Sequence, residues 1–354
     1  MNDKINIPFY AKVALISIGF FAFGFAIHLG QDIIIPVVYA ILLAILLNPL
    51  VSFFMGMRCN RIISISLALL ISTILVFGAF YIILSQLTSF SDSLPELKGK
   101  FNLLFDNIIQ LISSKLNFPE KDVNKWISEI ELVIISNLEV KKSISFIGQS
   151  FFTVIILPVY IIMILYFKPL FLEFISRLFK REHHVAVTEV LQNSKKIIQS
   201  YLVGLFVEMI IVAVLNSAGL LFLEIDYAIL LGIIGALLNV IPYLGGIIGV
   251  ILFMVIALVT KSPVYMVYVM FLYSAIQFID NNYIVPRIVA SRVQINAFIS
   301  VIVVLIGGAL WGLSGMFLSI PLTAIMKVIF DHIEPLKPWG FLLGNTIPSK
   351  RLKK

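Results

Sequence analysis

A proline and three glycines interrupt a long apolar run in the second half of the chain. The run covers residues 228–259, and Pro242, Gly245, Gly246 and Gly249 lie at its centre. Proline removes a backbone donor and glycine tolerates dihedral angles that a helix does not use, so an entering helix is expected to stop just before the proline. In lipid, the backbone groups freed by such a break must be buried in protein or line a wet cavity. The run is therefore predicted to form two half-helices that meet inside the protein.

Composition assigns the chain to the integral membrane proteins. Of its 354 residues, 60% are hydrophobic and 13% are charged, and the mean hydropathy is +1.06. Long continuous apolar blocks favour a helix bundle over an outer-membrane barrel. The expected fold is all-α, a polytopic transmembrane helix bundle with about eight membrane segments. It includes two broken or re-entrant helical hairpins and an extracytoplasmic amphipathic helical hairpin.

Several classes of protein chemistry are excluded or disfavoured. The formal net charge of +7 indicates cytoplasmic loops of a membrane protein in preference to a nucleic-acid partner. Cys59 is the single cysteine, so neither an internal disulfide nor a CxxC-type zinc site is expected. No P-loop, HExxH or Ser/His/Asp pattern is present, and the adjacent His183 and His184 are interpreted as a solvated pair. The chain is predicted not to be an enzyme and to bind no cofactor or metal.

Three apolar spans are predicted in residues 1–88. They cover residues 13–29, 33–55 and 62–84, and each approaches the roughly 20 residues needed to cross the hydrocarbon. The first span has the basic flank of a signal peptide, but no small-x-small cleavage site follows, so it is expected to be retained.

Residues 89–143 have the composition of a soluble segment and are predicted to form an amphipathic helical hairpin. Apolar residues at helical spacing follow a capping signal from Ser93 to Glu96, and a second such series follows Asn117 and Pro119. The hairpin is expected to pack on the membrane domain or on a neighbouring subunit. A separate ligand-binding module is the alternative.

The remaining segments are a fourth span, a basic region, a transport core and a tail. They are assigned to residues 144–167, 168–200, 201–333 and 334–354, with the broken hairpins at residues 227–260 and 295–330. The arms of the first hairpin are shorter than the roughly 17 residues that a span needs, so a re-entrant pair is preferred over two full crossings. The second hairpin is interrupted at residues 307–315 and again at Pro321.

The distribution of basic residues predicts the orientation. One side of the membrane would hold both termini, the turn at Arg58, the basic region 168–200 and Arg287 with Arg292, and thus 18 of the 26 Lys and Arg residues. By the positive-inside rule that side is the cytoplasm.

The candidate site residues are polar groups within the predicted spans, where an ionisable side chain costs at least about 2.5 kcal/mol and usually faces the bundle interior. The candidate substrate- or ion-binding residues are Glu208, Asn239, Tyr243, Gln277, Asp280, Asn281 and Asn282, with Arg287 as a charge partner. The candidate breaks and hinges are Pro242, Gly245, Gly246, Pro286, Gly312, Gly315 and Pro321. The predicted site is shared by the break at Pro242, the break at residues 307–315 and the polar cluster 277–282.

Structural alternatives stand beside these roles. Glu208 either carries a proton or cation or keeps a hydrogen bond to a neighbouring helix. Asn239 either caps the freed backbone or contacts the solute. Gln277 and Asn281 share one face at helical spacing with Asp280 beside them, so this segment is either one polar strip or a helix end capped by water.

At these residues the chain resembles the AI-2E family of bacterial membrane proteins, the autoinducer-2 exporter family. The matching motifs are Gly204-x-x-x-Glu208, Tyr227 to Gly232, Asn239 to Gly245, Gln277 to Asn282 with Pro286-Arg287, Gly307 to Gly315 with Pro321, and Asn48-Pro49. The resemblance implies a cytoplasmic-membrane transporter with about eight membrane segments that assembles as a homo-oligomer, with a pentamer as the implied assembly. Family members are assigned to export of the furanone autoinducer-2, and others to sodium(lithium)/proton antiport.

The chain also departs from the family pattern. Where the family often has two adjacent acids after the glutamine, this chain has Asp280-Asn281, and Gly246 replaces the usual proline after the Ile-Pro-Tyr-Leu-Gly motif. A His-Pro pair of the family is replaced by Asn296-Ala297. The loss of one carboxylate and one histidine weakens any proton-coupling scheme taken from the family.

Three functions are carried forward. The first is a secondary transporter or facilitator that exports a small polar solute, autoinducer-2-like by resemblance, with both broken hairpins moving against a scaffold of the first four spans. The second is a sodium(lithium)/proton antiporter that uses Glu208 and Asp280. The third is a membrane scaffold that binds a partner through the 89–143 hairpin. The lipid bilayer is a partner in all three.

Overall fold

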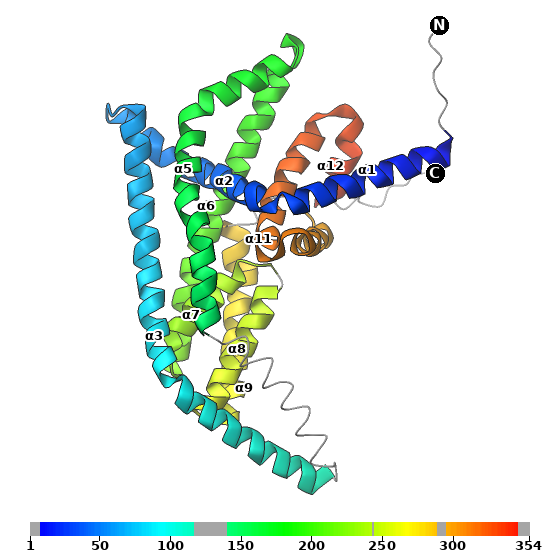
Figure 1. The fold of residues 1–354 in the computed structure, drawn as a ribbon. Helices are drawn as coiled ribbons and strands as arrows, with labels where there is room; N and C mark the ends of the chain where they lie inside the picture. The colour runs from blue at the N-terminus through cyan, green and yellow to red at the C-terminus, as the bar shows by residue number, and fades with distance from the viewer. Residues whose placement is uncertain (1–7, 117–139, 243, 289–294, 346–354) are drawn as a thin grey trace. The chain divides into compact units, whose positions relative to one another are not determined.

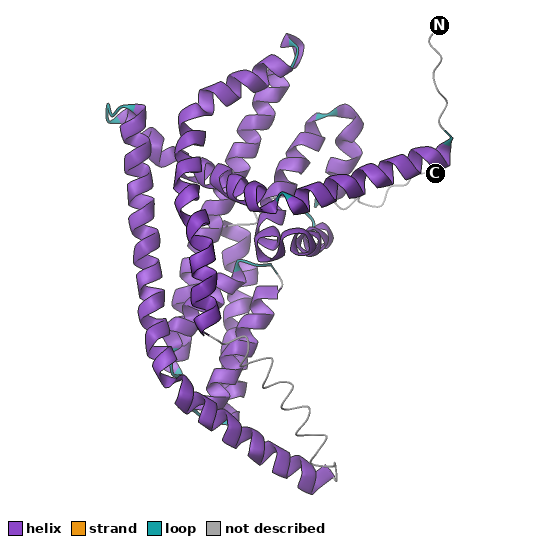
Figure 2. Ribbon diagram, in the orientation of Figure 1, coloured by secondary structure: helices purple, strands orange, loops and turns teal. Residues whose placement is uncertain are grey.

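The computed structural model of the chain describes residues 8–116, 140–242, 244–288 and 295–345. Throughout these residues the regular structure is helical and no strand occurs, which confirms the all-α fold class (Figure 2). The second amphipathic helix predicted after Asn117, the side chain of Tyr243, and the basic tail beyond residue 345 lie outside the described residues.

Figure 1 shows the helices of the described residues, coloured along the chain. In chain order they are α1 (Phe9–Leu29), α2 (Gln31–Gly56), α3 (Arg61–Leu116), α5 (Val140–Leu178), η1 (Arg181–His183), α6 (His184–Phe222), α7 (Ala228–Asn239), α8 (Leu244–Thr260), α9 (Pro263–Ile279), η2 (Asp280–Ile284), α10 (Val285–Ile288), α11 (Ala297–His332), η3 (Glu334–Leu336) and α12 (Lys337–Leu343). Among the described residues, seven helical stretches are long and apolar enough to span a membrane, while α7 and α8 are shorter apolar helices.

The chain divides into two compact units. The first comprises Met1–Asn48, Ile156–Gln199 and Val293–Lys354, and the second comprises Pro49–Ile155 and Ser200–Arg292. The first broken hairpin, α7 with α8, belongs to the second unit, and the second broken hairpin, within α11, belongs to the first. Both hairpins were predicted to move together against the first four spans. The two hairpins instead belong to different compact units.

Helix α3 is longer than predicted. It continues without interruption for 56 residues, through Pro95, so no new helix begins at Ser93. The Ser93 hydroxyl donates to the carbonyl of Ser89 one turn earlier, which leaves it unable to act as an N-cap. The predicted helix start at Ser93 is wrong because a helix already precedes it. Adding residues to an existing helix costs less than starting a new one, so the local capping pattern does not interrupt α3.

The first broken hairpin ends α7 at Asn239 and begins α8 at Leu244, as the Pro242 break predicts. The turn is closed by short-range hydrogen bonds, from the Ile241 amide to the Leu238 carbonyl and from the Gly245 amide to the Ile241 carbonyl. A Cβ on Gly245 would lie 1.7 Å from the Leu238 carbonyl oxygen. Only glycine allows the two arms to approach this closely at the start of α8.

The core of the second unit forms around this hairpin. Phe253 of α8 and Val269 of α9 are almost completely buried, and the Phe253 ring lies edge-on to the ring of Tyr273. At the far end of the hairpin, Phe90 of α3 makes an edge-to-face contact with Tyr227, the residue that precedes α7. These apolar contacts hold α7, α8 and α9 side by side and so determine which of their polar side chains meet.

The second broken hairpin is contained in α11. Trp311 and Gly312 have non-helical dihedral angles, and Gly312 has a φ of 59° in a region that favours glycine. A Cβ on Gly315 would lie 1.9 Å from the Gly307 carbonyl oxygen, although residues eight apart in a straight helix are about 12 Å apart. The chain therefore doubles back at Gly312. Pro321 lies within helical backbone, so the predicted second interruption there is wrong.

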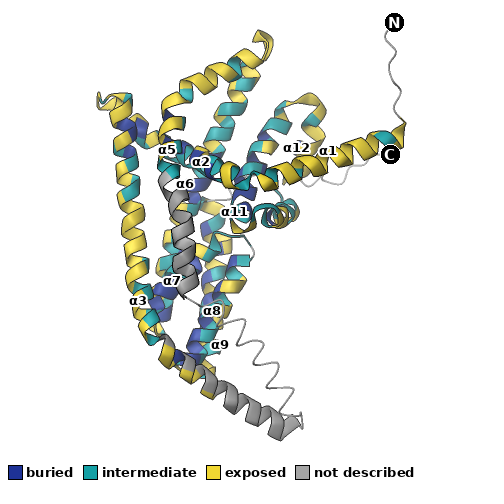
Figure 3. Ribbon diagram, in the orientation of Figure 1, coloured by how far each residue is buried: buried dark blue, intermediate teal, exposed yellow. Residues whose placement is uncertain are grey.

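The tip of this hairpin is hydrogen-bonded to the end of α1. The indole of Trp311 donates to the Ile27 carbonyl at 3.2 Å, and His28 Nδ1 donates to the Leu310 carbonyl at 2.6 Å. The last carbonyls of a helix lack partners within that helix, so the indole satisfies one of them. None of the residues of α1 is buried (Figure 3). An apolar helix this exposed within the chain requires lipid or another protein around it.

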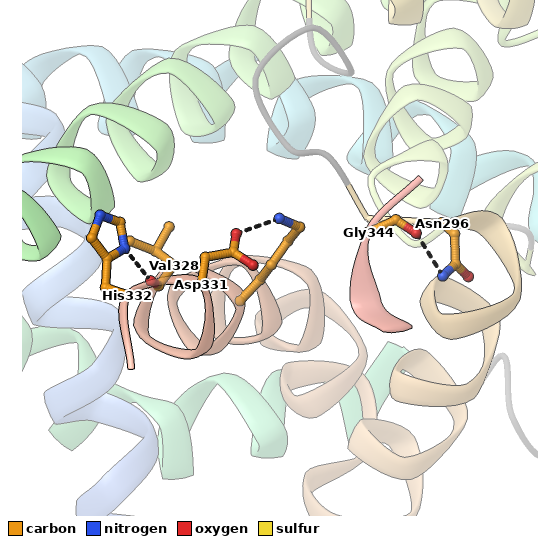
Figure 4. Close-up of polar contacts among 6 residues, drawn as sticks. Asn296, Val328, Asp331, His332 and Gly344 are labelled. Atoms are coloured by element: carbon orange, nitrogen blue, oxygen red, sulfur yellow. Dashed lines mark hydrogen bonds and ion pairs between the residues drawn. The ribbon is translucent and has the colours of Figure 1, made fainter. Parts of the chain in front are cut away.

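Asn296 joins the beginning of α11 to the end of α12. Its side-chain oxygen accepts from the Ile299 amide, and its side-chain nitrogen donates to the carbonyl of Leu342. The same nitrogen donates to the carbonyl of Gly344 (Figure 4). Its own backbone amide donates to the Leu343 carbonyl. One residue thus caps the start of one helix and the end of another. Asn296 was noted above as a departure from the resembled pattern, and its side chain is engaged at both helix ends.

The replacement Asn296→Ala is expected to release α12 from α11. The alanine loses the cap of α11 and leaves two carbonyls of α12 without a partner, at a cost of about 1–2 kcal/mol. We expect faster amide hydrogen exchange over residues 337–344 and little change elsewhere. Asn193→Ala is the matched control, because Asn193 lies within α6 and forms no side-chain hydrogen bond in the described structure. Equal exchange in both variants would contradict the capping role.

Candidate functional site

Four polar side chains of the second unit meet where the first broken hairpin turns. Glu208 lies in the middle of α6, Asn239 is the last residue of α7, Gln277 lies near the end of α9, and Asp280 begins η2. We call these four residues the carboxylate–amide cluster. All four were predicted as site residues. They come from three separate helical segments, namely α6, α7 and the continuous helix formed by α9 and η2.

Asn239 is the centre of the carboxylate–amide cluster. Its Nδ2 donates to Asp280 Oδ2 at 2.9 Å and to Glu208 Oε1 at 3.3 Å. Its Oδ1 accepts from Gln277 Nε2 at 3.4 Å. Carboxylates only accept hydrogen bonds, so the amide nitrogen has to face them. Asn239 therefore contacts the candidate site residues and does not cap the end of α7. Glu208 holds the hydrogen bond to a neighbouring helix that was one of its two predicted roles.

Both carboxylates are buried without a positive partner. Asp280 is 1% exposed and Glu208 is 6% exposed. In the part of the chain that the structure describes, neither forms an ion pair with Lys, Arg or His. Asp280 Oδ1 is fully buried and has no hydrogen-bond partner. Two buried carboxylates next to each other repel, and one amide between them offsets only part of that cost.

Asp280 is the first residue of the short π-helix η2 and is buried. It lies one helical turn after Ile276 of α9, which is also buried, so it continues the inward face of that helix. Asn281 and Asn282 are exposed, and the Asn282 amide donates to the carbonyl of Phe278 on its own helix. Of the predicted polar strip of Gln277, Asp280 and Asn281, the first two belong to the carboxylate–amide cluster, whereas Asn281 is exposed.

The other candidate residues are not members of the carboxylate–amide cluster, although a Cβ on Gly246 would lie 4.0 Å from Gln277 Oε1 and a Cβ on Gly245 would lie 2.9 Å from the Asn239 backbone nitrogen. Arg287 is exposed and forms no ion pair among the described residues, so it has no charge partner there. Pro286 lies within α10, in continuous helix, and so makes no break. Gly245 and Gly246 lie in the first turn of α8, and Gly312 and Gly315 belong to the second hairpin in the first unit.

The carboxylate–amide cluster is rich in acceptors. Among the described residues, each carboxylate has one oxygen with no hydrogen-bond partner, as does the Gln277 amide. Asn239 and Gln277 are only partly buried, whereas both acids are buried. Free carboxylate and amide oxygens bind either cations or the hydroxyl and amine hydrogens of a solute. The chemistry of this site is therefore reversible binding.

Sequence reasoning missed two further polar residues of the second unit. Asn216 of α6 is 1% exposed, and Tyr273 of α9 is 7% exposed, and neither side chain has a hydrogen-bond partner in the described structure. The available signal for Asn216 was an amide within the fifth predicted span, eight residues after Glu208. Tyr273 gave no comparable signal, because a tyrosine in a membrane helix is common.

Comparison with known proteins extends over nearly the whole chain. A family model described as AI-2E family transporter matches residues 15–334. The YrrI protein of Bacillus subtilis (strain 168) is 24% identical over 311 residues, covering 85% of this chain and 87% of YrrI. The AI-2 transport protein TqsA of Escherichia coli (strain K12) is 23% identical over 321 residues, covering 90% of this chain and 91% of TqsA. The resemblance inferred from the motifs is confirmed, and the chain belongs to the AI-2E family of transporters.

Proposed function

We propose that this protein is a secondary transporter or facilitator that exports a small polar solute, autoinducer-2-like in chemistry, and binds it at the carboxylate–amide cluster. The observation that carries the proposal is the convergence of Glu208, Asn239 and Asp280, buried in an apolar helix bundle with free acceptor oxygens. A solute with several hydroxyl groups donates to these oxygens. The AI-2 transport protein TqsA, a relative along most of the chain, supports the choice of solute.

The first broken hairpin is proposed as the gate. Asn239 lies at its tip and holds α6 and η2 together through two hydrogen bonds. A shift of the tip breaks both bonds and exposes the two carboxylates behind it. Cysteines placed at Ile241 on the hairpin tip and Leu205 on α6, in a Cys59→Ser background, report this motion. Equal crosslinking with and without an imposed gradient would contradict a moving hairpin.

A solute screen on reconstituted vesicles tests the proposed function. Vesicles loaded with autoinducer-2 are expected to release it faster than protein-free vesicles, and a sodium or proton gradient is expected to change the rate if transport is coupled. Other small polyols and sugars serve as competing solutes. Release at the protein-free rate for every solute, with and without either gradient, would contradict the proposal.

Sodium(lithium)/proton antiport is the second candidate function. It is favoured by the two buried carboxylates, which have no basic partner in the described structure. Such a pair binds a small cation or a proton in turn, because either one offsets the same repulsion. The carboxyl end of α7 adds carbonyl oxygens, which coordinate sodium ions at broken helices of other transporters.

The surroundings of the protein are also part of the proposal. We place it in a bacterial cytoplasmic membrane with both termini on the cytoplasmic side, as the distribution of basic residues predicts. The exposed apolar surface of α1 suits contact with lipid or with another copy of the chain, which supports the homo-oligomer that the family resemblance implies.

A further inference from the structure

Helix α12 folds back along the end of α11 in the first unit, and Figure 1 shows the two helices side by side. A Cβ on Gly340 would lie 3.1 Å from the Asp331 backbone nitrogen, and a Cβ on Gly344 would lie 3.4 Å from Lys327 Cε. Later residues of α12 thus contact earlier residues of α11, so the two helices run antiparallel. Helix α12 therefore lies beside the last turns of α11 and does not extend the chain away from them.

Those last turns of α11 form the edge of an apolar span. No Asp, Glu, Lys or Arg occurs from Ala297 to Met326, and Lys327 and Asp331 then form an ion pair near the end of α11. Asn296, which precedes α11, donates to carbonyls at the end of α12, so the start and the end of α11 meet α12 at one level. Charged side chains of membrane helices gather near the helix ends, where they reach the lipid headgroups. Helix α12 is therefore expected at headgroup depth.

The two sides of α12 differ in exposure. Gly340 is buried against α11, and Leu343 and Gly344 on the same side are half-buried. The opposite side carries three large apolar residues, each about 100° or more from Gly340 around the helix. They are Trp339, which is 58% exposed, Phe341, which is 55% exposed, and Leu342, which is 53% exposed. These three side chains form an apolar, aromatic surface that faces away from α11.

A basic segment follows this surface in the sequence. Residues 350–354 contain Lys350, Arg351, Lys353 and Lys354, and no acid occurs in residues 344–354. The segment is joined to α12 by residues 344–349, and six extended residues span at most about 20 Å, so its charges stay near the apolar surface. Each Lys or Arg near an anionic membrane surface contributes about 1 kcal/mol to binding. The chain itself has a formal net charge of +7, so electrostatic attraction favours an anionic membrane over a second copy of the chain.

We propose that α12 and residues 350–354 form an interfacial anchor that binds anionic phospholipid. Trp339, Phe341 and Leu342 insert among the acyl chains just below the headgroups, and the four basic residues bind the lipid phosphates. Tryptophan is enriched at this depth because its ring is apolar and its N–H is polar. An apolar aromatic face combined with Lys and Arg is the pattern of interfacial helices that bind anionic membranes. The anchor fixes α12, and with it the base of the second broken hairpin, at the membrane surface.

A nitroxide attached at Leu342→Cys in a Cys59→Ser background tests the apolar part of the anchor. The full-length protein is placed in nanodiscs of phosphatidylcholine with phosphatidylglycerol, and the collision rates of the nitroxide with oxygen and with a water-soluble nickel chelate are compared. Oxygen concentrates in lipid and the chelate in water, so we expect more frequent collisions with oxygen. Val185→Cys is the matched control, because Val185 is 80% exposed in the basic region of the same unit and is expected to lie in water.

Replacing the four basic residues by glutamine in one protein tests the charged part of the anchor. With the nitroxide at residue 342 and the basic residues intact, the ratio of oxygen to chelate collisions is expected to be at least about twofold higher with phosphatidylglycerol than in phosphatidylcholine alone. The neutral variant is expected to give the same ratio in both lipids, because it has lost the charges that anionic lipid attracts. Lys180→Gln with Arg181→Gln is the control, since it removes two exposed bases of the same unit and should keep the lipid dependence.

Three results would overturn the anchor. The first is more frequent collision with the chelate than with oxygen at residue 342, which places the apolar surface in water. The second is infrequent collision with both reagents together with spin–spin coupling between copies, which places a second copy on the surface. The third is an equal collision ratio in the two lipids when the basic residues are intact. None of these measurements involves solute transport, so a failure of the proposed function does not affect them.

Discussion

Neutralising both carboxylates of the cluster, with Glu208→Gln and Asp280→Asn in one protein, is expected to abolish sodium-driven proton flux in reconstituted vesicles. The two amides keep the size of the side chains and can still hydrogen-bond to Asn239, but they bind neither a proton nor a cation. Hydrogen bonds to charged groups contribute about 1.5–3 kcal/mol, so driven autoinducer-2 release is also expected to fall at least about tenfold.

The stability of this double variant distinguishes a functional role from a structural one. The wild-type acids are 6% and 1% exposed and have no basic partner among the described residues, so the neutral variant no longer bears the cost of burying two charges. We therefore expect an unchanged or higher melting temperature together with the loss of flux. A lower melting temperature with proportionate loss of flux would indicate a structural pair only.

A matched control for the double variant is Glu173→Gln with Asp226→Asn. Both acids are exposed, and Glu173 forms a surface ion pair with Arg177 that is expected to contribute little to stability. This control should retain wild-type flux. Unchanged proton flux in the Glu208 and Asp280 variant itself would exclude the antiport function.

Replacing Gly232 or Gly245 by alanine is expected to prevent correct packing of the first broken hairpin. A Cβ on Gly232 would lie 2.1 Å from the Ser217 hydroxyl and 2.6 Å from the Ser217 backbone nitrogen. A Cβ on Gly245 would lie 1.7 Å from the Leu238 carbonyl oxygen. Backbone atoms cannot move aside as a flexible side chain can, so we expect a destabilisation of about 3 kcal/mol or more in each variant. The melting temperature and the yield of monodisperse protein measure it.

Gly24→Ala is the matched control for the glycine variants. Gly24 lies within α1, where a Cβ would meet nothing within 4 Å. Alanine is favoured over glycine in a helix by about 0.5–1 kcal/mol, so this variant should melt at or above the wild-type temperature. If Gly232→Ala melted like Gly24→Ala, close approach of α6 and α7 would not be needed for the fold.

Much of the helical architecture was predictable because its causes are local. Pro242 and the adjacent glycines end one helix and start the next wherever they occur, and the structure places the break between Asn239 and Leu244. The apolar runs likewise predicted α1 and α2 to within four residues at either end. Ser93 shows the limit of this reasoning, since its capping pattern is real in the sequence but lies inside continuous helix α3.

The site was predictable in its residues and only in part in its geometry. Polar side chains in apolar spans are expensive, so Glu208, Asn239, Gln277 and Asp280 were candidates on composition alone. Asn281 and Asn282 were grouped with them but are exposed, because the spacing of polar residues alone does not tell which side of this helix packs inward. The structural role of Asn296 depends on the end of α12, about 46 residues away, which no local pattern reveals.

The sequence by itself determined the membrane class, the two breaks and the polar residues that the spans carry, because these follow from hydropathy and from the backbone chemistry of proline and glycine. Only the tertiary structure decided that Asn239 bridges Glu208 and Asp280, and that the two hairpins belong to different compact units. The physical reason is that partners far apart in the chain are selected by close packing. Close contacts at glycines, such as Gly232 with Ser217 and Gly235 with Phe253, fix how the helices are aligned along their axes. That alignment determines which polar groups meet.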